Sequence, residues 1–250
     1  MFIESRQNQR VKRWKKLHKK KYRDQEQSFL VEGWHLIEEV LNSDWTPQEL
    51  IVLEGIEYPT IWERYPIYTV TQAVFDEVSQ TESHQGVLAV VSQNESDHKP
   101  TYHKLLLIDS VQDPGNLGTI IRSAVAFNID AVVVGQDSVD LYNDKVVRST
   151  QGALFHLPII RDELSRWLDY CHNHNIKVYG TALDEQALSL SQVQPSEKYA
   201  VIVGNEGSGV SETLLNSADE TVYIPIATKS ESLNVGVATS IVLYHFSQAT

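Results

Sequence analysis

Two polar side chains stand where an apolar run of the sequence gives way to a turn and then to a helical pattern. The apolar run ends at Ile108, Pro114 and Gly115 form the turn, and Asn116 and Arg122 follow on the predicted helix. A guanidinium can fix a phosphate and stabilise negative charge that develops on a nearby hydroxyl. The alternative is structural, with Asn116 near the helix cap and Arg122 facing solvent.

A second segment places a carboxylate inside a glycine-rich loop that follows another apolar run. Gly204 and Gly209 have the spacing of a Walker A phosphate loop, but Val210 occupies the position of the lysine. Glu206 would repel a phosphate, and no G-x-G-x-x-G pattern follows a predicted strand. The loop therefore favours a cationic or neutral ligand. S-adenosylmethionine is such a ligand, because it carries a sulfonium and an ammonium but no phosphate.

A third segment combines a strand that stops at Pro225 with a polar loop and a helix that begins at Ser232 or Asn234. Simple capping of the helix by Ser232 explains this pattern as well as a functional role does. All three segments follow predicted strands, and ligands of parallel sheets bind beyond the carboxyl ends of the strands. The three segments are therefore candidates for one ligand site.

Strands alternate with helices from residue 104 onward. The strand at 105–109 is continuously apolar, as expected for a strand that is buried on both faces. Such alternation predicts an α/β fold with a mostly parallel sheet covered on both sides. The expected strands are 105–109, 131–134, 177–181, 200–204 and 221–224, and the expected helices are 116–127, 144–150, 162–174 and 233–246.

The part of the chain before residue 104 predicts a smaller α/β domain at 28–91 and a linker at 92–103. The linker is polar and contains Pro100. The smaller domain is expected to contain a helix at 34–41, strands at 49–53, 67–70 and 86–91, and a helix from Thr71.

Charge is distributed unevenly along the chain. The whole sequence carries a net charge of −12, yet residues 1–23 contain ten Lys and Arg and one acid, which leaves −21 on the other 227 residues. This split predicts a basic arm at 1–27 that meets a polyanion, with Trp14 and Tyr22 as stacking groups. The alternative is a solvated, partly disordered N-terminus.

Composition excludes several classes of protein. No apolar run approaches the roughly 20 residues that span a bilayer, and the basic first 30 residues lack the apolar core of a secretory signal. The single cysteine, Cys171, excludes an internal disulfide and a cysteine cluster for zinc, and the nine histidines have no metal-like spacing. The sequence indicates a reduced, metal-free cytoplasmic protein without a membrane partner.

Taken together, the three segments resemble the signature motifs of the SpoU (TrmH-like) family of RNA 2′-O-ribose methyltransferases, within the SPOUT superfamily. The resemblance covers residues 104–250, and 147–155 is similar to the stretch between the first two motifs. A weaker resemblance over 29–91 points to an RNA-binding domain of the L7Ae/L30e type. The family fold is an α/β sheet whose C-terminal part is threaded as a deep trefoil knot, which sequence patterns alone would not suggest because knots are rare.

The resemblance also implies a cofactor, a set of site residues and an oligomeric state. The cofactor is S-adenosylmethionine, and the family's enzymes are homodimers. The residues that it places at the reaction centre are Arg122, Asn116, Glu206, Ser232 and Asn234, and those that it assigns to cofactor binding are Gly204, Ile224, Leu233, Thr181, Val203, Asn205 and Gly207. The last helix is apolar nearly all round, which favours a partner subunit over burial beneath the N-terminal domain.

The implied activity is methylation of a ribose 2′-hydroxyl in large-subunit (23S) ribosomal RNA, with tRNA as the alternative substrate. A catalytically inactive RNA-binding paralogue is the rival, and the nucleotide and its base cannot be read from the sequence. Arg122 either loses its proton and acts as the base, or stays charged and stabilises a developing alkoxide. Glu206 either takes part in the chemistry or holds Arg122 or loop N–H groups in place.

Overall fold

The computed structural model describes residues 1–93, 101–184, 186–227, 229 and 231–248. The chain forms two compact units, one from residues 1–94 and 140–155 and one from residues 95–139 and 156–250. Most of the expected linker, residues 94–100, lies outside the described residues. Each unit is built on its own sheet.

The first unit contains a five-stranded mixed sheet. Its strand order is β1 (Phe2–Ile3), β4 (Ile67–Val70), β3 (Pro47–Leu53), β5 (Val87–Ser92) and β2 (Ser28–Glu32). The pairs β1·β4 and β3·β4 are parallel, and β3·β5 and β2·β5 are antiparallel. The helices are α1 (Gln9–Lys16), α2 (Lys20–Glu26), α3 (Trp34–Leu41), α4 (Gln72–Val78) and α6 (Asp144–Ser149), with the 3-10 turns Thr60–Arg64 and Ala153–Phe155.

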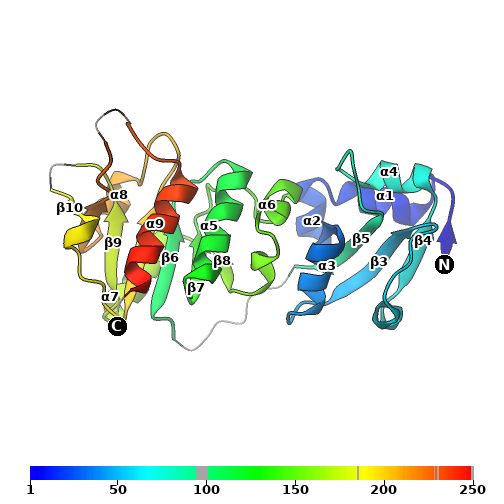
Figure 1. The fold of residues 1–250 in the computed structure, drawn as a ribbon, viewed down its shortest axis with the longest axis horizontal. Helices are drawn as coiled ribbons and strands as arrows, with labels where there is room; N and C mark the ends of the chain where they lie inside the picture. Colours follow the sequence, from blue (N-terminus) through cyan, green and yellow to red (C-terminus); the bar gives the residue numbers. More distant parts are fainter. Residues whose placement is uncertain (94–100, 185, 228, 230, 249–250) are drawn as a thin grey trace. The chain divides into compact units, whose positions relative to one another are not determined.

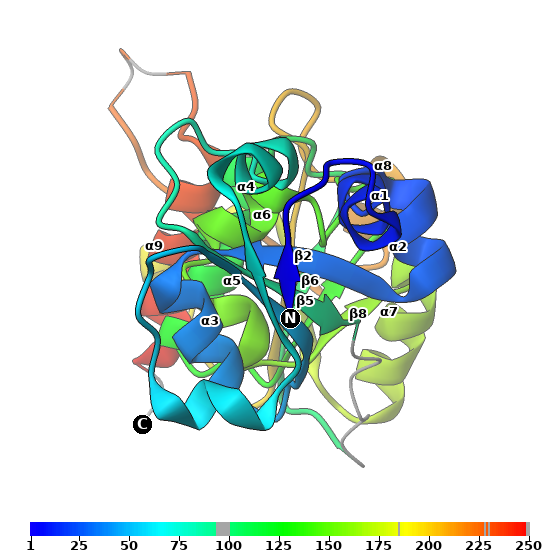
Figure 2. The ribbon, with the colours of Figure 1, turned by 90° about the vertical axis from the view of Figure 1, so that its right-hand side faces the viewer.

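The basic N-terminal segment is folded into this unit. Figure 2 shows α1 and α4 on one side of the sheet and α3 on the other. Val11, Trp14 and Leu17 are buried against β3, β4 and α4, and the indole N–H of Trp14 donates to Glu49 at 2.8 Å. The segment expected to be an arm is therefore anchored by its apolar residues, and Trp14 is not exposed as a stacking group.

The second unit contains a seven-stranded parallel sheet. Its order is β10 (Leu188–Ser189), β12 (Glu220–Tyr223), β9 (Lys177–Thr181), β11 (Tyr199–Val203), β6 (Lys104–Ile108), β7 (Ala131–Val134) and β8 (Ile159–Arg161). Every pair of neighbours is parallel, which confirms the expected α/β fold with a parallel sheet. The helices are α5 (Pro114–Ala126), α7 (Leu164–Asn173), α8 (Glu212–Asn216) and α9 (Val235–Ser247), with the 3-10 turn Leu190–Gln192.

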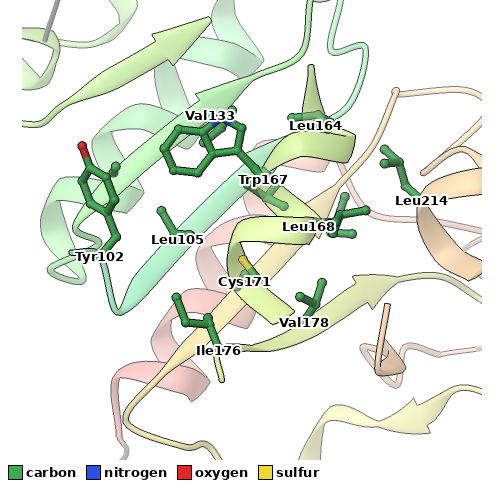
Figure 3. Close-up of a cluster of buried hydrophobic side chains, with 14 of the residues drawn as sticks. Tyr102, Leu105, Val133, Leu164, Trp167, Leu168, Cys171, Ile176, Val178 and Leu214 are labelled. Carbon is green, nitrogen blue, oxygen red and sulfur yellow. The ribbon is translucent and has the colours of Figure 1, made fainter. Parts of the chain in front are cut away.

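Helices cover both faces of this sheet. Figure 3 shows Trp167, Leu168 and Cys171 of α7 packed on one face, where they belong to the same apolar cluster as Leu105 and Val133. Successive residues of a strand point to opposite faces, so the alternate side chains of β6 point to the helices on the other face of the sheet. There, α5 and α9 lie side by side (Figure 1). The sheet thus holds the starts of α5 and α9 next to each other.

Candidate active site

The first of the three segments begins a helix two residues earlier than the sequence pattern suggested. Helix α5 starts at Pro114, and its N-cap is Asp113, whose side chain accepts the N–H of Asn116 at 2.9 Å. Proline at the first helical position has no N–H to leave unpaired. Asn116 therefore lies in the first turn of the helix, and its own side chain is available for other contacts.

A carboxylate and two amides join all three segments. The side-chain NH₂ of Asn116 donates to Glu206 at 3.0 Å, and the side-chain NH₂ of Asn234 donates to the Asn116 carbonyl oxygen at 2.8 Å. Glu206 also accepts the backbone N–H groups of Gln112 at 3.1 Å and Asp113 at 3.0 Å. These contacts fix which way each amide points. Three of the residues that the resemblance placed at the reaction centre are thereby brought together.

The surroundings of Glu206 keep it ionised. Burial acts to raise its pKa, but the hydrogen bonds from Asn116 and from the backbone N–H groups outweigh burial, and the pKa lies below its ordinary value. A carboxylate that accepts several N–H groups and has a lowered pKa is a poor proton acceptor near neutral pH. Glu206 thus holds the loop N–H groups, one of the two roles anticipated for it, and within the described residues it forms no hydrogen bond or ion pair with Arg122.

The glycine-rich loop folds back on itself. Asn205 and Gly209 exchange backbone hydrogen bonds of 2.9 and 3.0 Å, and the Asn205 side-chain oxygen accepts the N–H of Gly207 at 2.9 Å. The Asn205 side-chain NH₂ donates to the carbonyl of Ser110 at 2.8 Å. A side chain at Gly204 would overlap the Gly209 backbone. Asn205 therefore shapes this loop and ties it to the first segment.

The third segment starts helix α9 with Asn234 as its N-cap. The Asn234 side-chain oxygen accepts the N–H groups of Gly236 at 3.0 Å and Val237 at 3.2 Å. Ser232 is therefore not the cap. A side chain at Gly236 would come within 3.0 Å of Thr119 on α5, so glycine permits the close approach of the two helices.

An apolar cavity of about 220 Å³ lies beside these segments. Most of its lining side chains are aliphatic or aromatic, with Thr181, Ser232 and Thr239 as aliphatic hydroxyl groups and Glu231 as a carboxylate. The residues that line it are Thr181, Ala182, Leu183, Val203, Val222, Tyr223, Ile224, Ile226, Glu231, Ser232, Leu233, Val235, Ala238, Thr239 and Val242. Leu233 and Val235 flank Asn234, so the cavity adjoins the carboxylate–amide network.

The residues assigned to cofactor binding from the sequence divide into two groups. Four of the seven residues assigned to cofactor binding line the cavity, namely Thr181, Val203, Ile224 and Leu233. The other three, Gly204, Asn205 and Gly207, form the adjacent loop instead. The structure adds lining residues from α9, such as Val242, that sequence reasoning missed because their apolar pattern predicts only burial.

The other two residues implied for the reaction centre, Arg122 and Ser232, are both exposed. Arg122 is exposed on α5, and within the described part of the chain no hydrogen bond or ion pair engages its guanidinium. Ser232 lines the cavity and is also exposed. The cation is thus available to a ligand that approaches from solvent.

Two further features concern ligands and membranes. In the described residues, no cluster of three or more His, Cys, Asp and Glu side chains is arranged to hold a metal ion. No helix found there is both long enough and apolar enough to span a lipid bilayer.

Family models match both parts of the chain. Residues 103–244 match the model of the SpoU rRNA Methylase family, and residues 8–89 match the MRM3-like substrate binding domain. The second match begins within the basic segment, in agreement with the folding of α1 into the first unit.

Individual proteins are similar over nearly the full chain. A 23S rRNA (guanosine(2553)-2′-O)-methyltransferase, RlmP of Bacillus subtilis, is 45% identical, covering 97% of this chain and 98% of that protein. An AdoMet-bound rRNA methyltransferase from Sinorhizobium meliloti is 27% identical with a TM-score of 0.89, covering 98% and 97% of the two chains. AviRb from Streptomyces viridochromogenes, in complex with AdoMet, is 26% identical with a TM-score of 0.83, covering 97% and 98%.

Proposed function

The chain belongs to the SpoU rRNA methylase family, and we propose from this premise that it transfers a methyl group from S-adenosylmethionine to a ribose 2′-hydroxyl of 23S ribosomal RNA. The observation that carries the proposal is the junction of the apolar cavity with the Glu206–Asn116–Asn234 network, built from the three family motifs. Because the chain is 45% identical to RlmP, the 23S rRNA guanosine in the name of that relative is the first nucleotide to test for methylation.

The cavity fits the proposed cofactor. Its aliphatic walls suit an adenine ring, and its lining includes a carboxylate but no cationic side chain among the described residues, in keeping with a positively charged ligand. Thr181 donates its hydroxyl to the carbonyl of Ile202 at 2.9 Å, which fixes its side chain at the cavity wall. We assign Val203, Ile224 and Leu233 to contacts with the adenosyl group. When bound, the cofactor supplies an activated methyl group on its sulfonium.

The protein's own side chains act by positioning and charge. An arginine guanidinium is a donor without an acceptor atom, and Glu206 is held ionised by its donors, so neither kind of group is set up to remove the hydroxyl proton. Arg122 instead holds an RNA phosphate and stabilises negative charge on the attacking oxygen. Glu206 and Asn234 orient the side chain of Asn116, which lies in the first turn of α5, toward the ribose.

Two experiments test the proposed function. The purified protein should bind S-adenosylmethionine and S-adenosylhomocysteine in calorimetry, and should not bind ATP or NAD at comparable concentration. Ribose methylation should then be mapped in ribosomal RNA and tRNA from a strain that lacks the gene. Loss of one 2′-O-methyl group from 23S rRNA is expected. Loss from tRNA alone would overturn the substrate, and binding of ATP without S-adenosylhomocysteine would overturn the cofactor.

We further propose that the first unit binds the RNA and is related to the L7Ae/L30e type. Helix α1 carries Lys12 and Lys16, and Lys19 is the N-cap residue of α2; all three are exposed, whereas Lys15 is paired with Glu77. Exposed lysines on these neighbouring elements suit the phosphate backbone of RNA. Removal of residues 1–23 would also remove the buried Trp14, so point substitutions are the better test.

Replacement of Lys12, Lys16 and Lys19 together by alanine should weaken RNA binding and leave cofactor affinity unchanged. Each lost phosphate contact should reduce the slope of log affinity against log salt by about 0.7 to 0.9, because fewer counterions are released. Fluorescence anisotropy at several salt concentrations measures the slope. Lys15→Ala is the matched control, since Lys15 is already paired. An unchanged slope in the triple variant would exclude this surface as the RNA contact.

We also propose a homodimer, a C-terminal trefoil knot and a cytoplasmic location, on the basis of family membership. The support for the dimer is α9, which exposes Val237 (47%), Ile241 (38%) and Tyr244 (58%) at helical spacing. Its opposite side is buried through residues such as Val242 and Phe246. A second copy of this chain would cover the exposed stripe. Because α9 begins at Val235, which lines the cavity, the dimer contact would adjoin the cofactor cavity.

Ile241→Asp should therefore convert a dimer into monomers and reduce methyltransferase activity in parallel. Light scattering should report about 57 kDa for the wild type, twice the chain mass of 28.3 kDa, and about half of that for the variant. Leu188→Asp is the control, because Leu188 on β10 has nearly the same exposure, 39%. A wild-type monomer with full activity would show that the stripe does not mediate assembly.

A further inference from the structure

The lining of the cofactor cavity has one charged side chain. Among its described lining residues, Glu231 alone carries a formal charge, and its neighbours in the lining are Ser232, Leu233 and many aliphatic groups. The carboxylate of Glu206 belongs to the loop network and does not line the cavity. A positive charge on a molecule in the cavity is therefore attracted chiefly by the carboxylate of Glu231.

Glu231 belongs to the segment that leads into the N-cap of α9 and hence into the carboxylate–amide network. It precedes Asn234 by three residues, and the side chain of Asn234 is bonded to Asn116 at 2.8 Å. Ser232 and Leu233, between the two, also line the cavity. The chain segment that carries Glu231 therefore runs from the lining of the cavity into the carboxylate–amide network.

The proposed cofactor and its product differ in charge at one atom. Transfer of the methyl group to an oxygen leaves the sulfur as a neutral thioether, because the electron pair of the broken carbon–sulfur bond stays on sulfur. The ammonium and carboxylate of the amino-acid end are the same in both molecules. A nearby carboxylate consequently attracts the cofactor more strongly than the product.

We propose that Glu231 is the residue that distinguishes S-adenosylmethionine from S-adenosylhomocysteine by the charge on the sulfonium. This inference rests on the proposed function. Glu231 strengthens binding of the charged cofactor and, once the methyl group has left, contributes nothing comparable to retention of the product. It thereby limits product inhibition.

Calorimetry on the full-length Glu231→Gln variant tests the proposal with three ligands. These are S-adenosylmethionine, S-adenosylhomocysteine and sinefungin, an analogue with a protonated amine in place of the methylated sulfonium. Affinity for S-adenosylmethionine and sinefungin should fall roughly three- to fivefold, the size of an exposed charge pair, while affinity for S-adenosylhomocysteine stays unchanged. In the wild type, added salt should weaken the two charged ligands more than S-adenosylhomocysteine.

Glu212→Gln provides the control, because Glu212 is an exposed acid of the same unit that does not line this cavity. It should leave all three affinities unchanged. Thermal melting checks that both variants are folded. An equal loss for all three ligands would assign Glu231 to the shared ammonium and overturn the proposal, as would no loss at all. If the wild type binds none of the three ligands, the proposed function itself fails, independently of the result for the Glu231→Gln variant.

Discussion

Replacement of Arg122 by alanine should lower the turnover number by about a hundredfold or more, because preorganised charge at a developing anion commonly supplies this much. Arg122 is exposed on α5 and does not line the cofactor cavity. Affinity for S-adenosylmethionine should therefore be unchanged in the variant. Single-turnover methylation of RNA at saturating cofactor, together with calorimetry, separates the two effects.

Two further substitutions define what Arg122 contributes. Arg122→Lys should not restore turnover, since an ammonium cannot replace a planar guanidinium that holds two oxygens at once. Arg166→Ala is the matched control, because Arg166 is an exposed arginine on α7 whose pairs with Asp162 and Glu163 lie at the surface. Near-normal activity in Arg122→Lys would mean that turnover requires only a positive charge at this position. Normal activity in Arg122→Ala would remove Arg122 from the mechanism.

The fold of the central sheet could be predicted because its strands are short apolar runs bounded by polar residues. The bounds expected for 131–134 and 177–181 agree with β7 and β9, and those for 34–41 agree with α3. Strands buried on both faces permit few polar residues, so their ends are visible in the sequence. The structure adds short elements such as β10, which have too few residues to show a period.

The N-terminal segment shows where composition misleads. Its lysines and arginines suggested an arm, but Val11, Trp14 and Leu17 recur at helical spacing and are all buried. Three apolar residues among many charges produce a weak pattern, and their burial depends on a sheet that forms from distant residues. The net charge of the segment therefore reflects its exposed residues and gives no sign of the buried ones.

The residues of the candidate site could be predicted from the sequence more easily than the contacts between them. The motifs pointed to Asn116, Glu206 and Asn234, and the structure joins these three side chains. The helix caps were harder to predict, because Asp113 competes with Asn116 at one helix start and Asn234 with Ser232 at the other. All four can cap a helix, and only the backbone path decides between them.

Gly204→Ala should be the most disruptive single-methyl change in the site. The added carbon would overlap the Gly209 carbonyl and the Val210 amide, which are backbone groups that cannot rotate away. Relief of the overlap requires opening the Asn205–Gly209 hydrogen-bonded pair. Overpacking of this kind costs about 1–3 kcal/mol, and each kcal/mol lowers Tm by about 2–4 °C for a domain of this size. Affinity for S-adenosylmethionine should fall at least about tenfold, because the displaced loop follows Val203 of the cavity wall.

Gly207→Ala separates this steric effect from a general sensitivity of the loop. A side chain at Gly207 would lie 3.6 Å from the Asn205 side-chain oxygen, an ordinary contact, so its Tm and cofactor affinity should stay close to those of the wild type. Differential scanning calorimetry and cofactor titration compare the two variants directly. Equal losses in both would mean that the loop requires flexibility at every glycine. Full stability and affinity in Gly204→Ala would mean that the loop relaxes around the methyl group, and that the tight backbone approach at Gly204 does not support the cofactor site.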